Sequence, residues 1–189
     1  MDDMNWGMEF RFKDLLLVTG SGRNVGKTTF ICDVIASNPR RKMAAVKISP
    51  HFHEPTEGLE TIIETETFRI YEETNFESSK DTSRYLLAGA VKSYYIQTTD
   101  DGLLEAFRLT SVLLEPDLPF IVESARLGKL LTPELFIFIQ HSDSVDKPFS
   151  IEMREKADFT VFSQDNEFSM SPEQVYYSHN WRIEEHDYA

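Results

Sequence analysis

The chain has 189 residues, of which 41% are hydrophobic, and it carries 19 Lys and Arg against 32 Asp and Glu, a formal net charge of −13. This length suits one α/β core, so we expect residues 1–189 to form a single domain. The acidic balance argues against a nucleic-acid partner, because phosphate neutralisation needs clustered Lys and Arg and the short stretch 38–42 (NPRRK) does not reverse the sign. It favours a soluble protein or a basic protein partner.

Cysteine content and apolar runs bear on the compartment. Cys32 is the only cysteine of the chain, which excludes a disulfide framework and a thiolate metal cluster and fits a reducing compartment. The first residues, MDDMNWGMEFRFKD, lack the basic segment and apolar core of a signal peptide, and no apolar run approaches the ~18 residues of a membrane span. We therefore expect a soluble, cytoplasmic protein without a membrane contact.

The first elements along the chain are expected to be a strand, a loop and a helix. Residues 15–19 (LLLVT) form a continuous apolar run, typical of a parallel strand that is covered on both faces. A glycine-rich turn follows. Apolar residues then recur at helical spacing across 30–35, and Pro39 ends the helix.

Strands and helices alternate along the rest of the chain. Short runs rich in apolar and β-branched residues predict strands at 43–49, 67–73, 91–97, 118–124, 135–140 and 159–164. Helices are predicted at 81–90 and 102–114, and the acidic segment 54–66 is expected to form a solvated loop or a short edge helix. About seven strands alternating with helices predict an α/β fold, a three-layer doubly wound arrangement around a mostly parallel sheet.

The turn GSGRNVGKTT (20–29) has the features of a phosphate-binding loop. Such a loop needs converging backbone N–H groups, residues that tolerate unusual backbone angles, and a helix N-terminus that favours negative charge. Glycines give the backbone freedom, Lys27 can reach the β- and γ-phosphates, and Thr28 can ligate Mg²⁺. The predicted nucleotide-binding residues of the loop are Ser21, Gly22, Arg23, Asn24, Val25, Gly26, Lys27, Thr28 and Thr29.

One position of this loop departs from the strict pattern G-x-x-x-x-G-K-[ST]. Ser21 stands where that pattern has its first glycine, with Gly20 and Gly22 on either side. A simple helix-opening turn with an exposed lysine is the alternative interpretation. The position between a buried strand and an amphipathic helix favours a phosphate loop, because the motif requires that context.

The glycines before Gly-Lys-Thr resemble the loops of the SIMIBI class of P-loop NTPases, which includes the dethiobiotin synthetases and the MobB-type proteins of molybdopterin-guanine-dinucleotide biosynthesis. Three blocks resemble the MobB type: 45–54 (AVKISPHFHE), 80–90 (KDTSRYLLAGA) and the strand with an acidic end at 120–124 (FIVES). The usual Val-Glu-Gly of that family is replaced here by Val-Glu-Ser. The signature lysine at the start of some loops of this class falls at Gly22, which disfavours the dimerising ParA/MinD type.

This resemblance implies a P-loop NTPase fold and a slow, Mg²⁺-dependent GTPase or ATPase that serves as an accessory in molybdenum cofactor biosynthesis, with a homodimer or another protein as partner. Two alternatives stay open. One is a nucleotide-switched adaptor with negligible turnover, in which the nucleotide orders loops around 50–60 and 124–132. The other is a dethiobiotin-synthetase-like ATP-dependent ligase, because the G-T-x-x-x-V-G-K-T loop of that family has the spacing of residues 20–28.

Two charged residues are predicted to lie at the carboxyl ends of strands, where ligands of open α/β sheets bind. Glu123 could hold Mg²⁺ or orient the attacking water, the alternative being a strand-end acid that faces solvent. Lys47 interrupts an apolar strand at its end, so we expect its side chain to point into the crevice and contact the ligand.

Catalysis would rest on Lys27, which with Mg²⁺ offsets the charge that develops on the transferred phosphoryl group. Asp81 most simply caps its helix, and Arg84 could pair with it across one turn. The family resemblance adds roles at the nucleotide for both, Asp81 at the metal and Arg84 at the phosphates. Arg23 and Arg84 are the candidates for an arginine finger, and the weakness of both predicts a slow intrinsic rate.

Base recognition is the least specified function. Asp143 follows a late strand, where guanine-specific P-loop proteins place an acid, but the preceding Gln-His replaces the Asn-Lys of N-K-x-D, so GTP and ATP both stay open. The sequence EKAD at 155–158 is closer to N-K-x-D, but it ends a helix, so its side chains are expected to be surface charges. The histidines of 51–53 (HFH) could ligate a metal, but a solvated loop pair fits their surroundings better.

Overall fold

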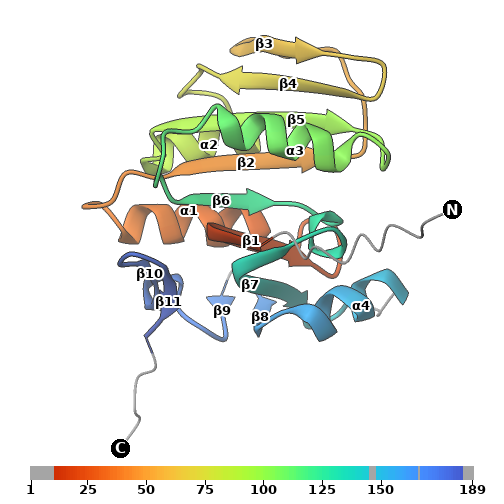
Figure 1. Ribbon diagram of the computed structural model, residues 1–189. Coiled ribbons are helices and arrows are strands. Elements are labelled where there is room, and N and C mark those ends of the chain that lie inside the picture. Colours follow the sequence, from red (N-terminus) through yellow and green to blue (C-terminus); the bar gives the residue numbers. More distant parts are fainter. Residues whose placement is uncertain (1–10, 145–147, 166, 185–189) are drawn as a thin grey trace, which may run out of the picture.

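The computed structural model describes residues 11–144, 148–165 and 167–184. Across these residues, nine strands form one large sheet and two more form a separate hairpin (Figure 1). The strands are β1 (Arg11–Gly20), β2 (Ala44–Ser49), β3 (Leu59–Glu64), β4 (Phe68–Glu73), β5 (Lys92–Thr98), β6 (Phe120–Glu123), β7 (Thr132–His141), β8 (Phe159–Gln164), β9 (Glu167–Phe168), β10 (Val175–Tyr177) and β11 (Trp181–Ile183). The helices are α1 (Lys27–Ser37), α2 (Asp81–Ala88), α3 (Leu103–Val112) and α4 (Pro148–Lys156), with 3₁₀ turns η1 (Leu127–Lys129) and η2 (Pro172–Gln174).

The large sheet has the order β3-β4-β5-β2-β6-β1-β7-β8-β9. The run from β5 to β8 is parallel, and β3, β4 and β9 add antiparallel pairings at the two edges. The short β6 lies between β1 and β2, with Val122 level with Leu17 on one side and Val46 on the other. Parallel strands end at the same edge of a sheet, so the loops after β1, β2 and β6 meet there.

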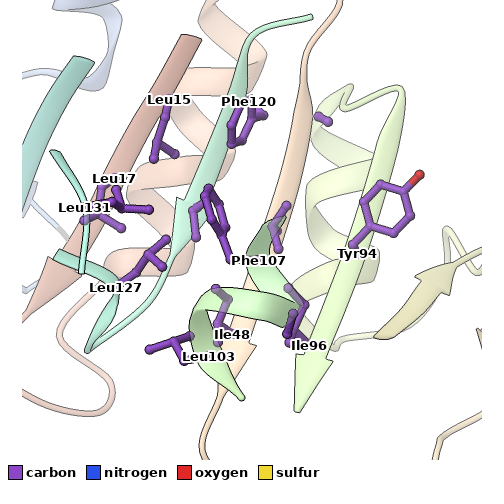
Figure 2. Close-up of a cluster of buried hydrophobic side chains, with 14 of the residues drawn as sticks. Leu15, Leu17, Ile48, Tyr94, Ile96, Leu103, Phe107, Phe120, Leu127 and Leu131 are labelled. Carbon is purple, nitrogen blue, oxygen red and sulfur yellow. The ribbon is translucent and has the colours of Figure 1, made fainter. Parts of the chain in front are cut away.

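Helices cover both faces of the sheet, because the central strands are apolar on both sides. On one face α3 and α4 pack on alternate residues of the strands, and Figure 2 shows Leu103 and Phe107 of α3 in one buried cluster with Ile48 and Ile96. This cluster continues to Leu127 of η1. It fixes the segment that leaves β6 against the sheet.

The opposite face is covered by α1, α2 and the hairpin of β10 and β11. Phe30 and Val34 of α1 and Tyr85 of α2 are buried against the alternate residues of the same strands. The hairpin is fastened by Trp181, whose Nε1 donates to the backbone oxygen of Asp14 at 2.9 Å. The result is a three-layer α/β arrangement around a mostly parallel sheet.

The predicted strands and helices are confirmed, but the predicted number of strands is wrong: nine strands, not about seven, form the large sheet among the described residues. The segment 54–66 was expected to lack a strand, yet it contains β3, which pairs with β4 across an antiparallel hairpin. Its charged and exposed residues, which suggested a loop, are typical of an edge strand that must avoid further pairing. Within the described residues no helix combines the length and the apolar character needed to cross a bilayer.

Candidate functional site

The loop between β1 and α1 needs glycine at its two ends. A Cβ on Gly20 would lie 2.6 Å from the backbone oxygen of Ile139, closer than side chains tolerate. Gly26 has φ +92° and packs against the ring of Phe168, 3.0 Å from where a Cβ would lie. Both positions are therefore restricted by the neighbouring backbone or ring, and Gly26 also by its left-handed conformation.

Ser21 is accommodated because its position requires no unusual conformation. The Ser21 N–H donates to the Ile139 oxygen at 3.0 Å, and its Oγ accepts from the N–H of His141 at 3.3 Å. Among the described non-glycine residues of this loop, a positive φ occurs at Asn24 and not at Ser21. The side chain is buried and ties the loop to the end of β7. The departure from the strict glycine pattern thus has a local structural reason.

Residues far along the chain support the loop from behind. Ser163 of β8 donates from its Oγ to the Val25 oxygen at 2.8 Å. Phe168 of β9 contacts Gly26 and stacks edge-to-face on Phe30 of α1, with ring centroids 5.1 Å apart. This support was not predicted, because no local sequence pattern links residues 138 positions apart.

Lys27, the first residue of α1, turns its side chain back over the loop. Its Nζ donates to the Gly22 oxygen at 2.6 Å and lies 3.9 Å from Oε1 of Glu123. The side chain is only 14% exposed, so the exposed lysine of the alternative interpretation is wrong. Burial lowers the pKa of Lys27, and the nearby Glu123 offsets this only in part. An anion that entered the loop would find a partly desolvated cation in place.

The N-terminus of α1 adds backbone donors to this cation. Its N-cap is Gly26, and no side chain among the described residues caps the helix there. The first N–H groups of a helix lack intrahelical acceptors, and the helix dipole concentrates positive potential at that end. The loop, the helix end and Lys27 together form an arrangement suited to phosphate.

Glu123 joins the loop to the rest of the site. It is 3% exposed, so the alternative of a strand-end acid that faces solvent is wrong. Oε2 accepts from Thr28 Oγ1 at 2.8 Å and from the hydroxyl of Tyr85 at 2.6 Å, and Oε1 accepts from Lys47. A carboxylate that accepts from three donors is suited to anchoring and metal binding more than to proton abstraction.

Tyr85 is the member of this network that the sequence analysis missed. It lies four residues after Asp81 on α2, and residues at that spacing share a helix face. Burial, and then the adjacent Glu123 carboxylate, raise the pKa of Tyr85 well above its usual value, so the hydroxyl remains a donor. The sequence held one signal for this residue: Tyr85 lies on the same face of the predicted helix as Asp81, which was already a candidate site residue.

Lys47 and Asp81 extend the network toward the edge of the sheet. Lys47 Nζ lies 2.8 Å from Oδ2 of Asp81 while it also donates to Glu123. Burial alone would lower the pKa of Lys47, but attraction to Glu123 and Asp81 outweighs it and raises the pKa. Burial alone would raise the pKa of Asp81. The attraction of Lys47 and hydrogen bonding with Thr28 outweigh burial and lower this pKa below its usual value.

The expected capping role of Asp81 is wrong. The N-cap of α2 is Lys80, and no side-chain hydrogen bond caps this helix in the described structure. Asp81 instead directs its carboxylate to Lys47. Arg84 was expected to pair with Asp81 or to reach a phosphate, and its Nη2 donates to Thr29 Oγ1 at 3.2 Å.

Arg23 links the loop to the segment after β2. Its Nη2 lies 2.6 Å from Nε2 of His51. His53 instead uses its backbone, which donates to Oε1 of Gln97 at 3.3 Å. Among the described residues no cluster of three or more His, Cys, Asp or Glu side chains is arranged to hold a metal by itself.

Two hollows flank the loop between β1 and α1. The larger, about 1000 Å³, is bordered by Gly20–Arg23 and Lys27, by Lys47, and by Glu123. The smaller, about 360 Å³, lies on the other side, between Ser21–Val25 and the turn with Asp143. The structure therefore brings Lys27, Thr28, Lys47, Asp81 and Glu123 together, and it leaves Asp143 apart from them.

No protein-family model, curated protein or solved structure is significantly similar to this chain. The function has to be inferred from the residues of the site and their geometry.

Proposed function

We propose that this protein has a P-loop NTPase fold and binds a nucleoside triphosphate with Mg²⁺ in the loop 21–29. The observation that carries the proposal is a hydrogen bond between the two halves of such a site, the start of α1 and the end of β6. Thr28 Oγ1, at the start of α1, donates to Glu123 at the end of β6 at 2.8 Å. A hydroxyl after the loop lysine and a carboxylate at the end of the adjacent strand are the pair that P-loop proteins use around Mg²⁺.

The phosphates would take over donors that the protein now satisfies internally. Lys27 holds the Gly22 oxygen, and the side chain is long enough to exchange this acceptor for phosphate oxygens. The uncapped N–H groups at the start of α1 would bind the same anion. Because Lys27 is largely desolvated already, its attraction to phosphate is less screened than that of a surface lysine.

The residues present fit Mg²⁺. This ion prefers oxygen ligands and is usually held by one or two carboxylates, water and substrate phosphates. Thr28 and Glu123 would hold it, and Asp81, whose carboxylate interacts with Thr28, would support them. When bound, Mg²⁺ would neutralise charge on the phosphate oxygens. Lys47 lies between the two carboxylates, and it would turn toward the phosphates when a metal joins them.

Hydrolysis, GTP or ATP alike, would be slow. Lys27 would offset charge that develops on the transferred oxygens, and Lys47 would add a second cation. Arg23 borders the larger hollow, whereas Arg84 is directed to Thr29 on the far side of the helix start, so Arg23 is the better candidate for an arginine finger. Its contact with His51 holds it at the surface, where it would contribute little until that contact changes.

The resemblance of its sequence blocks supports a role similar to that of the MobB-type accessories of molybdenum cofactor biosynthesis.

A nucleotide-switched adaptor is the second candidate, and the contact of Arg23 with His51 favours it. This contact joins the phosphate loop to the exposed segment 50–57, so occupation of the loop would reposition a surface available to a protein partner.

The test is thermal unfolding with GTP, ATP and their diphosphates, with and without Mg²⁺. A ligand at 100 times its Kd adds about 2.7 kcal/mol, which in a chain of this size raises the midpoint by roughly 5–10 °C. We expect a Mg²⁺-dependent shift that is larger for triphosphates than for diphosphates. The absence of a shift with every nucleotide would refute the proposal, and phosphate release measured on the same samples separates an NTPase from an adaptor.

A further inference from the structure

The larger hollow extends well beyond the phosphate loop. One end is formed by the loop, Lys47 and Glu123, and the other by Arg126 and Lys129 around η1 together with Phe149 of α4. Its volume of about 1000 Å³ is at the upper end of the range for small-molecule sites. Terminal phosphates at the loop would occupy only the first end.

The charge of this hollow opposes that of the molecule. Among the described residues that border it are five basic side chains, from Arg23, Lys27, Lys47, Arg126 and Lys129, and two acidic ones, Asp100 and Glu123. The whole chain has a formal net charge of −13. Asp81 and Glu152, just outside the border, pair with Lys47 and Lys129, which leaves an excess of one base, and this excess favours an anion over a cation.

The far end is also apolar. Leu103 at the start of α3, Leu130 after η1, and Phe149 border it beside the two bases. Lys129 Nζ lies 4.7 Å from the centre of the Phe149 ring, so the base and the ring form one surface. A ligand that suits this end carries an anionic head and an apolar body.

The bases at this end already bind carboxylates. Arg126 pairs with Asp100, and Lys129 Nζ lies 2.7 Å from Oε2 of Glu152. In each pair both side chains are more than one-third exposed, and such pairs contribute little stability. A ligand carboxylate could replace either partner at low cost and in the same geometry.

In the proposed complex the nucleoside would lie in the hollow of about 360 Å³ beside Asp143. That hollow shares Ser21, Gly22 and Arg23 with the larger one, but it is not bordered by Arg126, Lys129 or Phe149. We propose that the end with Arg126, Lys129 and Phe149 binds a second substrate, a small organic carboxylate with an apolar body, next to the terminal phosphate. This assignment as a second substrate rests on the nucleotide site proposed above.

The test uses 1-anilinonaphthalene-8-sulfonate, a fluorescent anion with an aromatic body, titrated into the full chain with saturating Mg²⁺ and GTP or ATP. We expect binding to persist beside the nucleotide and to weaken about tenfold in Arg126→Gln/Lys129→Gln, because two charge-assisted contacts are lost. Lys156→Gln is the matched control, since Lys156 also pairs with Glu152, at 3.5 Å, but does not border the hollow. Octanoate should displace the probe, and neutral octanamide should not.

Equal probe affinity in the parent and the double variant, or displacement of the probe by octanamide as well as by octanoate, would overturn the inference. Complete displacement of the probe by nucleotide would do the same, since it would mean one shared site. Failure of the proposed function is distinguishable, because it appears as the absence of a nucleotide-induced thermal shift in the parent. In that case the probe titrations without nucleotide still decide whether the carboxylate site exists.

Discussion

The two sides of the loop 20–26, the proposed phosphate-binding loop, differ in how firmly their side chains are held. Toward β6 and β2, Thr28, Tyr85, Lys47 and Glu123 come from four elements and bond to one another in a mostly buried network. Toward the end of β7, Asp143 is exposed, and its backbone N–H bonds only two residues back, to Nδ1 of His141 at 3.2 Å. The first side is a buried network joined by hydrogen bonds, and the second is a surface turn.

This difference separates two functions that a nucleotide site must combine. Binding of phosphate and metal requires charges fixed in advance, because preorganised groups avoid the ordering cost on binding. Base selection requires fixed hydrogen-bond partners, whereas Asp143 is exposed at a surface turn. We therefore expect strong preference for triphosphates and weak preference between guanine and adenine.

The largest effect is expected from Glu123→Gln. This change leaves Lys47 and the partly buried Lys27 without their shared carboxylate, and breaking such a buried pair should cost about 3 kcal/mol of unfolding free energy. Urea unfolding at pH 7 measures the loss. Glu72→Gln is the control, because its pair with Lys92 lies at the surface and should cost less than about 1 kcal/mol. Similar losses in both variants would contradict the buried network.

The next effect concerns binding in Lys27→Ala. We expect triphosphate affinity to fall about 100-fold, since a charge-assisted contact in a desolvated site is lost. The unfolding free energy should hold or rise, because burial lowers the pKa of Lys27 and so disfavours its charged form in the folded protein. Calorimetric titration with a nonhydrolysable triphosphate checks the affinity. Lys156→Ala is the surface control, and unchanged affinity in Lys27→Ala would refute the assignment of the loop.

A smaller effect, with a defined pH dependence, is expected from Asp81→Asn. The folded-state pKa of Asp81 is lowered, so its stabilisation is present above the unfolded value of 3.8 and disappears as pH falls through the folded value. At pH 7 the variant should lose less than about 1 kcal/mol, because the carboxylate is partly exposed. Unfolding curves of parent and variant should converge as pH falls through the folded value, which lies below 3.8, and a difference that persists below the folded value would exclude the Lys47 pair as its origin.

The smallest effect is expected on the other side of the loop. Asp143→Ala should change triphosphate affinity by no more than about twofold and should reduce any preference for GTP over ATP, because an exposed side chain contributes little binding energy. Competition of GTP and ATP in the same titration measures both quantities. A large loss of affinity for both nucleotides would mean that the turn at Asp143 is ordered by the ligand, and the contrast between the two sides would then disappear.

Sequence reasoning succeeded where the signal is local. The apolar run 15–19, the glycine-rich turn and the helix after it lie within one short segment, and all three have the predicted structure. It failed for β3, because an acidic edge strand has the composition of a loop. It left the exposure of Lys27 open, because the carboxylate 3.9 Å from this lysine is 96 positions away and lies beside it only in the fold.

The sequence by itself determined a central parallel strand, the glycine-rich loop and the residue types that phosphate chemistry needs. These follow from backbone geometry and from the spacing of apolar residues, which act over a few positions. Only the tertiary structure decided that Glu123 meets Thr28 across a separation of 95 residues. It did so by placing β6 between β1 and β2, so that one buried carboxylate is shared by Thr28, Tyr85 and Lys47.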